Sequence, residues 1–447
     1  MSSLSFCRLS NFFLRRTFRV SGYCSRSTDS KIVRNLVQRI KAVGAVPVSD
    51  YMREVLTSPS EGYYMTRDVF GEDGDFTTSP EISQMFGEMI GVWFVDEWLK
   101  NGSVSPVQLV ELGPGRGTLV DDILRVFKRF PEIQNAVSVH LVEISPALSQ
   151  IQIEKLSGAK LTVEQKEKLM EVYNLGHSGE LKISDKSRND SKHFYKCTTK
   201  YGTEAYWYKV LHDVPSKHSL YVAHEFFDAL PVCKFQKTVD KGWCEVMVDI
   251  NPDKDSPNQF RFVLSPGSTP NSTGYLRHIR PDDKRDHVEV APYSGMIILQ
   301  IAERIKQQGG CALIADYGHN GEKTDTLRGF KNHQLHDVLC DPGTADLTAD
   351  VDFSFFNKLC LSTKVVSPYG PITQREFLKN MGIHLRLSML LKDKDEKTKK
   401  NLVTGYDMIT NPTKMGDRFK FFAMMQKKDK DYVPSGFADL SFQFPVK

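Results

Sequence analysis

The stretch LVELGPGRGTLVDDILRVF, from Leu109 to Phe127, constrains the fold of this 447-residue chain more than any other. It has the pattern of a short apolar strand, three glycines at alternate positions and an amphipathic helix. Strands that alternate with helices form a mainly parallel, doubly wound sheet, which binds ligands beyond the carboxyl ends of its strands. Glycines let the backbone approach a ligand closely, and a helix N-terminus offers free N–H groups. We therefore expect a nucleotide-like ligand across Gly113, Gly115 and Gly117.

Acidic residues narrow the choice of ligand. The glycines follow G-x-G-x-G rather than the dinucleotide pattern G-x-G-x-x-G, because position 118 is Thr. Glu111 precedes the turn, where it suits an ammonium group, and Glu143 ends the next predicted strand, where it suits two ribose hydroxyls. S-adenosylmethionine carries both groups and no phosphate, so it is the predicted cofactor, with a nicotinamide dinucleotide as the alternative. Asp213, in the loop after the third strand, is predicted to lie near the adenine.

The N-terminal region has two parts. Residues 1–28 contain five arginines and no acid, which predicts a mitochondrial transit peptide. The net charge falls from +4 to −1 without these arginines, so nothing electrostatic favours nucleic acid as a partner. Residues 29–80 read as two helices, whose apolar faces also suit a homodimer, and a long loop rich in Gly and Thr. We expect this loop to cover the cofactor with Phe76, Thr78 and Ser79.

The remaining segments follow from changes of pattern. Residues 81–233 form the first part of the core, with a charged, mobile insertion at 154–201, and residues 234–290 form a β-meander insertion. Residues 291–430 form the second part of the core, and 431–447 form a C-terminal tail. No apolar run approaches the ~20 residues of a membrane span, so stable membrane insertion is not expected. The eight cysteines include no CxxC pair, which predicts reduced thiols in the mitochondrial matrix and no metal site.

The stretch LYVAHEFFDALPV, at 220–232, places three polar residues where a fourth strand ends. His224, Glu225 and Asp228 follow the apolar part of the strand, and a helical turn would put Glu225 and Asp228 on one face. Carboxylates at this edge of the sheet are candidates for chemistry. Weaker candidates for the substrate pocket are Asp316, Tyr317, Asp346, Thr348 and Asp352. Turn-forming or capping roles are alternatives for the last three.

Several long motifs resemble the MidA family, from about Ile32 to Phe422. They are EGYYM, GDFTTSPEIS, FGEMIG, VELGPGRGTL, HEFFDALPV, ALIADYG and PGTADLTADVDF. The mitochondrial members of this family are protein arginine methyltransferases that assist the assembly of respiratory complex I. The resemblance implies an α/β class I S-adenosylmethionine-dependent methyltransferase fold. It also implies symmetric dimethylation of an arginine in a complex I core subunit.

Arginine methylation would assign roles to the residues after the fourth strand. Glu225 is predicted to bind the guanidinium, Asp228 to assist it or to cap the helical turn, and His224 to accept a proton or to be structural. Well-studied symmetric enzymes hold the guanidinium between two glutamates of one loop, whereas this loop has one. A non-catalytic, S-adenosylmethionine-binding assembly chaperone is the second hypothesis. A nicotinamide-dependent oxidoreductase is the third.

Overall fold

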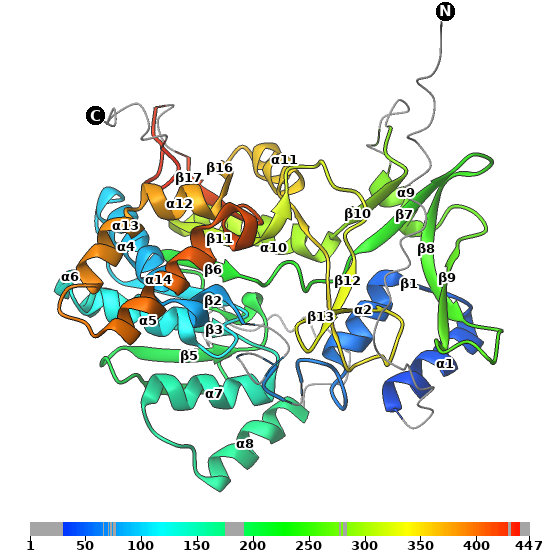
Figure 1. Ribbon diagram of the computed structural model, residues 1–447, viewed down its shortest axis with the longest axis horizontal. Helices are drawn as coiled ribbons and strands as arrows, with labels where there is room; N and C mark the ends of the chain where they lie inside the picture. Colours follow the sequence, from blue (N-terminus) through cyan, green and yellow to red (C-terminus); the bar gives the residue numbers. More distant parts are fainter. Residues whose placement is uncertain are drawn as a thin grey trace, which may run out of the picture.

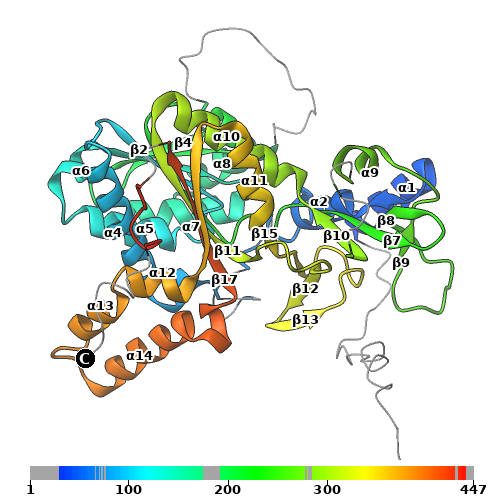
Figure 2. The ribbon, with the colours of Figure 1, turned by 90° about the horizontal axis from the view of Figure 1, so that it is seen from above.

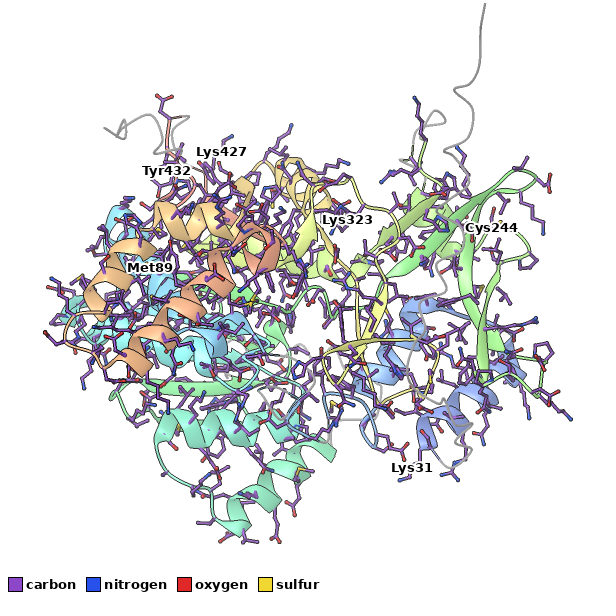
Figure 3. All side chains as sticks on the ribbon, viewed as in Figure 1. Lys31, Met89, Cys244, Lys323, Lys427 and Tyr432 are labelled. Atoms are coloured by element: carbon purple, nitrogen blue, oxygen red, sulfur yellow. The ribbon has the colours of Figure 1, made fainter. Side chains whose placement is uncertain are left out.

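The structure is a computed structural model of the chain. It describes residues 30–65, 67–69, 71, 74, 77–174, 192–276, 279, 284–427 and 431–438. The predicted transit peptide and Phe76 lie outside the described residues. The described chain forms two lobes, a larger one around a long sheet and a smaller one that contains the N-terminal helices (Figure 1). Met89 and Tyr432 lie in the larger lobe, and Lys31 and Cys244 in the smaller (Figure 3).

A nine-stranded sheet forms the centre of the larger lobe. Its order is β16 (Val366–Thr373), β17 (Phe419–Gln426), β11 (Gly310–His319), β6 (Ser219–His224), β2 (Val107–Leu112), β3 (Val137–Val142), β5 (Glu204–Tyr208) and β4 (Tyr195–Thr198). The short β15 (Val351–Asp352) extends the sheet at the end of β11. The strands from β11 to β5 are parallel, whereas β17, β16 and β4 are antiparallel to their neighbours. This topology confirms the predicted mainly parallel sheet.

Helices cover both faces of this sheet (Figure 2). One face packs against α4 (Gln84–Lys100), α5 (Thr118–Phe127) and α7 (Pro146–Ser157), and the other against α10 (Pro292–Gln308) and α11 (Phe353–Thr363). Side chains alternate between the faces, so Leu109 of β2 lies in the first apolar cluster and Val110 in the second. Every residue of β2 is buried, as expected for a central parallel strand.

The smaller lobe combines the N-terminal helices with strands from the middle of the chain. Its five-stranded sheet contains β1 (Val46–Pro47), β8 (Gly242–Ile250), β7 (Cys233–Thr238), β10 (His287–Val290) and β9 (Phe260–Leu264). The apolar faces of α1 (Lys31–Val43) and α2 (Val48–Thr57) pack on this sheet. The predicted meander is therefore present, but it shares one core with the N-terminal helices instead of forming a separate unit. Those apolar faces are used within the chain, which removes the reason for expecting a dimer through them.

Further elements extend the two lobes. A three-stranded sheet of β13 (Gln334–His336), β12 (Arg328–Lys331) and β14 (Asp346–Thr348) also contributes Leu347 to the apolar cluster of the smaller lobe. The larger lobe also carries α12 (Gln374–Asn380), α13 (Ile383–Leu390) and α14 (Glu396–Thr410). Nowhere in the described residues is a helix long and apolar enough to cross a membrane.

The expectation of a mobile insertion at 154–201 needs correction. Its beginning belongs to α7, whose Leu156 is in the main apolar cluster, and its end forms β4 at the edge of the sheet. Between them, α8 (Val163–Asn174) packs Leu169 and Tyr173 against the same cluster. The charged residues of this segment lie on the exposed side of α8. They dominate its sequence, so its few buried apolar residues give no clear helical pattern. Residues 175–191 lie outside the described residues.

The C-terminal residues 431–438 lie against α4. The Glu97 side chain is fully buried, accepts a hydrogen bond from the Ser435 backbone N–H at 2.9 Å, and is hydrogen-bonded by the Tyr432 hydroxyl. The Trp93 indole donates to the Ser435 carbonyl at 2.8 Å. This part of the predicted tail is therefore fixed to the larger lobe.

Candidate active site

The glycine turn connects β2 to α5 at the carboxyl end of the sheet. Gly113, Gly115 and Gly117 have φ values of 63°, 54° and 75°, in the left-handed region that favours glycine. A Cβ on Gly113 would lie 2.7 Å from the Phe226 ring. The turn thus requires glycine for its conformation, and at Gly113 also for space.

Two buried carboxylates flank the turn. Glu111 is 2% exposed, and its Oε2 has no hydrogen-bond partner in the described part of the chain. Burial, together with the neighbouring Glu143, raises the pKa of Glu111 well above its ordinary value. The Glu143 carboxylate accepts hydrogen bonds from Ser145 N at 2.7 Å and Gln152 Nε2 at 3.0 Å, and burial raises its pKa to about 7. The structure therefore brings both predicted acids to the glycine turn.

Gln152 is a site residue that the sequence reasoning missed. It is fully buried on α7 and also donates to the Gly115 carbonyl at 2.7 Å, while its Oε1 accepts from the Trp207 indole at 3.0 Å. It thus connects the glycine turn to Glu143. A lone glutamine within a helix carries no signal that would identify this role.

Asp213 lies on the short 3-10 turn η1 (Leu211–Asp213), which follows β5. Arg304 of α10 fixes this turn, because its Nη2 donates to the carbonyls of Leu211 at 2.8 Å and Val214 at 2.9 Å. Arg304 is 8% exposed. Arg304 was not predicted as a site residue. It lies 91 positions after Asp213 in the sequence, and only the fold brings it to the turn that carries Asp213.

The turn after β6 differs from the predicted helical turn. Glu225 has a φ of 49°, so the backbone reverses there and does not continue into a helix. Asp316, at the carboxyl end of β11, holds this conformation. Its Oδ2 accepts hydrogen bonds from Phe226 N at 3.1 Å and Phe227 N at 2.9 Å. The adjacent strands β6 and β11 thus define the position of Glu225. No sequence pattern indicates a glutamate with a left-handed backbone conformation.

The Glu225 side chain is 11% exposed, and its Oε1 is buried without a hydrogen-bond partner among the described residues. The backbone N–H of Ser79 is close enough to the carboxylate to lower the pKa of that group. Burial and the charge of Asp228 raise the pKa of Glu225 well above its ordinary value. A cation placed at this carboxylate would relieve both effects.

His224 lies beside Glu225, among aromatic rings. Its Nε2 is 3.3 Å from Glu225 Oε1, without hydrogen-bond geometry. Its ring lies 4.9 Å from that of Phe86 and parallel to that of Phe419 at 6.2 Å. Burial lowers the pKa of His224 to about 3, so the ring is neutral at physiological pH and a poor proton acceptor. The structural alternative for this residue is therefore favoured.

Asp228 belongs to a group of buried acids at the junction of the two lobes. Its Oδ2 accepts from the Thr348 hydroxyl at 2.8 Å, and its side chain is hydrogen-bonded to that of Asp316. Burial raises the pKa of both acids, and the charge of Asp228 raises the pKa of Asp316 further. Asp346 accepts from the Tyr64 hydroxyl at 2.7 Å. Asp352, by contrast, caps α11, as its alternative role predicted.

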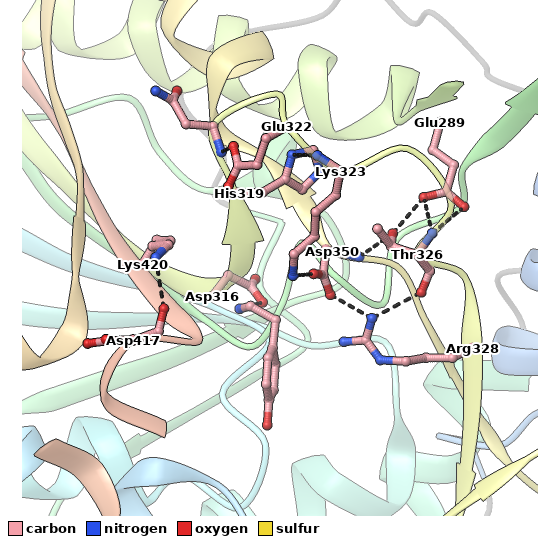
Figure 4. A network of polar contacts seen from close by, with 12 residues as sticks. Glu289, Asp316, His319, Glu322, Lys323, Thr326, Arg328, Asp350, Asp417 and Lys420 are labelled. Atoms are coloured by element: carbon pink, nitrogen blue, oxygen red, sulfur yellow. Dashed lines mark hydrogen bonds and ion pairs between the residues drawn. The ribbon is translucent and has the colours of Figure 1, made fainter. Parts of the chain in front are cut away.

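A polar network beside Asp316 connects the lobes (Figure 4). Glu289 of β10 accepts hydrogen bonds from the backbone N–H groups of Thr326 and Leu327. Arg328 donates to the Thr326 carbonyl at 3.0 Å, and its Nη1 lies 2.6 Å from Asp350 Oδ1. The positive charge of Arg328 also acts on Asp228. The network therefore holds the segment after β11 against the smaller lobe, next to the buried acids.

The residues around the glycine turn suit S-adenosylmethionine. The partnerless Oε2 of Glu111 is a buried acceptor for an ammonium group, and the glycine turn leaves room for a ligand at the backbone. Glu143, already oriented by Gln152, keeps lone pairs for ribose hydroxyls. Thr78 and Ser79 are buried at the start of α3 (Ser79–Ile82), on the side of Glu225.

A family model defines the class of protein. Residues 89–372 match the family described as "Putative S-adenosyl-L-methionine-dependent methyltransferase". The chain belongs to this family of S-adenosylmethionine-dependent methyltransferases, and S-adenosylmethionine is its cofactor. This confirms the family resemblance, the fold class and the cofactor expected from the sequence.

Mitochondrial proteins are among its relatives. The chain is 48% identical to a Homo sapiens protein named "Protein arginine methyltransferase NDUFAF7, mitochondrial", over 92% of this chain and 90% of that protein. It is 45% identical to the Drosophila melanogaster homologue, over 90% and 86% of the two chains. These names confirm the predicted mitochondrial location. The transit peptide and the matrix remain predictions.

A solved protein shares the fold. A Burkholderia thailandensis protein, solved with S-adenosyl-homocysteine bound, superposes with a TM-score of 0.66 at 21% identity. The comparison covers 91% of this chain and 92% of that protein.

Proposed function

We propose that this methyltransferase acts on the guanidinium of an arginine in a protein substrate, and that Glu225 binds that guanidinium. The observation that carries the proposal is the buried, partnerless Oε1 of Glu225 at the carboxyl end of β6. The names of the mitochondrial relatives support arginine as the substrate.

The chemistry requires a carboxylate in this position. Arginine stays protonated, so its nitrogens are poor nucleophiles. A carboxylate that accepts two N–H bonds fixes the guanidinium plane and leaves another nitrogen free to react. Bound S-adenosylmethionine supplies an electrophilic methyl carbon. Glu225, held by Asp316 and Ser79, orients the nitrogen toward it, and positioning of this kind contributes roughly 7–11 kcal/mol in favourable systems.

The proposal extends to the biological substrate. We place the reaction in the mitochondrial matrix, with an arginine of a complex I core subunit as its target and symmetric dimethylarginine as its product. The resemblance to mitochondrial members of the MidA family supports the target and the product. Nucleic acid, membrane insertion and a homodimer are not required by this mechanism.

A Glu225→Gln variant tests the proposal. Purified complex I subunits are incubated with the full chain and methyl-labelled S-adenosylmethionine, and dimethylarginine isomers are identified by mass spectrometry. We expect the variant to lose at least about 100-fold in transfer rate, because the neutral amide cannot pair with the guanidinium, while cofactor affinity stays within about threefold.

Glu245→Gln is the matched control. Glu245 is also a buried glutamate with a partnerless Oε2 in the described structure, but it lies in the smaller lobe on β8. This variant should keep full activity. Cofactor binding by the unsubstituted protein without any methyl transfer would favour the assembly chaperone instead.

A further inference from the structure

Arg116 occupies the position between the last two glycines of the turn, and its side chain contacts the segment before α3. Its Nη1 lies 3.3 Å from Glu81 Oε1, and its Nε lies 3.2 Å from Asp68 Oδ2. A Cβ on Gly71 would come within 2.8 Å of the same guanidinium. The segment before α3 thus packs against a side chain that belongs to the cofactor turn.

The short helix α3 connects this contact to Glu225. Glu81 forms a capping box with Thr78 at the start of the helix. The residue after Thr78, Ser79, is fully buried, and its backbone N–H lies beside the Glu225 carboxylate, whose pKa it lowers. A continuous path therefore runs from Arg116 through Glu81 and Ser79 to Glu225.

We propose that Arg116 is a positioning residue that couples cofactor binding on the glycine turn to the placement of Glu225. This inference rests on the proposed function, because it assigns Glu225 to the substrate. A ligand that fixes the glycine turn also fixes the backbone of Arg116, and Arg116 then holds α3 in place. The coupling is reciprocal, so a bound guanidinium also favours cofactor binding.

The ion pairs of Arg116 suit a coupling role better than a role in global stability. The side chains of Arg116, Asp68 and Glu81 are 38%, 31% and 10% exposed. Ion pairs at this exposure contribute little to the stability of a folded protein. A helix of four residues is nevertheless too short to hold its own position, so weak contacts decide how it is placed.

Hydrogen exchange of residues 77–82 tests the inference without any arginine substrate. The full chain is measured with and without S-adenosylhomocysteine, as Arg116→Ala, Arg116→Lys and the unsubstituted protein. In the unsubstituted protein we expect the ligand to slow exchange of this segment by about tenfold. In Arg116→Ala the slowing should disappear while ligand affinity stays within about threefold, and Arg116→Lys should restore part of it.

Arg125→Ala is the matched control. Arg125 lies on α5, has the same 38% exposure, and pairs with Asp122 at 2.6 Å and with Glu88 of α4 at 3.7 Å, both of which lie outside α3. It should leave the ligand-dependent slowing unchanged. Equal slowing in Arg116→Ala and the unsubstituted protein, or equal loss in Arg125→Ala, would overturn the inference.

A second arm separates this inference from the proposed function. Affinity for an arginine-containing peptide of a complex I subunit is measured with and without S-adenosylhomocysteine. We expect the ligand to raise peptide affinity at least about fivefold, and Arg116→Ala to reduce that gain to less than about twofold. If the peptide does not bind while the exchange effect persists, the arginine substrate is wrong and the link from Arg116 to Glu225 stands.

Discussion

At the scale of single residues, Gly113 occupies a position of the turn where no residue larger than glycine fits. We expect Gly113→Ala to lower the free energy of unfolding by about 2–4 kcal/mol, because it adds a clash with Phe226 to the cost of a left-handed alanine. Gly102→Ala is the control, since Gly102 has a φ of 85° and a Cβ there would meet no atom of the described residues within 4 Å. Denaturant titration of both variants compares the two costs. Equal destabilisation would mean that the turn tolerates a side chain.

A second residue-scale prediction concerns pH. Burial raises the pKa of Glu143 to about 7, so this group loses its proton between pH 6 and pH 8 in the free protein. Only the ionised carboxylate accepts hydrogen bonds with both oxygens. Through this group alone, S-adenosylmethionine should therefore bind about tenfold more weakly at pH 6 than at pH 8.

The same shift sets the sign for stability. The folded protein binds more protons than the unfolded chain from about pH 4.5 to 7, so this group makes stability fall as pH rises across that range.

Calorimetric titration of the Glu143→Gln variant with S-adenosylmethionine measures the effect of this group on binding. The variant should lose this tenfold part of the pH dependence, and an unchanged profile would contradict the assignment.

At the scale of elements, α10 holds the turn that carries Asp213. Arg304→Leu would remove the donor of the Val214 carbonyl and one of the two donors of the Leu211 carbonyl, which also accepts from the Val214 backbone N–H. We expect a loss of about 2–4 kcal/mol in the free energy of unfolding and weaker cofactor binding. Thermal unfolding and cofactor titration check both effects. Lys306→Ala, an exposed change on the same helix, should be nearly neutral.

The elements also show what the sequence could predict. The apolar strand predicted before the glycine turn is β2, because a fully buried strand leaves a clear apolar pattern. The predicted β-meander includes β8, β9 and most of β7, whose buried residues alternate with more exposed ones. The pairing of β1 with β8 was not predicted, since two residues are too few to show a period. The amphipathic helix predicted after the glycine turn is α5, which ends at Phe127, and a separate helix, α6 (Pro131–Ala136), begins at Pro131.

The residues of the candidate site also fall into two groups, those that the sequence could predict and those that it could not. Glu111, Glu143 and the glycines were found because they adjoin the strand and helix that define the turn. Gln152, Arg304 and the anchoring role of Asp316 depend on contacts between distant segments. The conformation of Glu225 depends on them as well, so no local pattern reveals it.

At the scale of the whole molecule, residues 431–438 stabilise the larger lobe. Removal of residues 431–447 would take away the Tyr432 and Ser435 donors of Glu97 and leave Lys100, whose Nζ is 3.7 Å away, as its charged partner among the described residues. We expect the truncated protein to lose about 3–5 kcal/mol of unfolding free energy. Adding Glu97→Gln to the truncated protein should recover part of this loss, since a neutral amide costs less to bury. No recovery in a denaturant titration would show that packing, not charge, dominates.

The place of β17 in the sheet has a consequence for how the protein matures. This strand lies between β11 and β16, yet it follows every other strand of its sheet in the sequence. A ribosome or an import channel delivers the N-terminus first, so the smaller lobe receives all five strands of its sheet by residue 290. The central sheet must wait until residue 426 has emerged. Until then β11 exposes an unpaired apolar edge, which is the form that chaperones bind and that aggregates most readily.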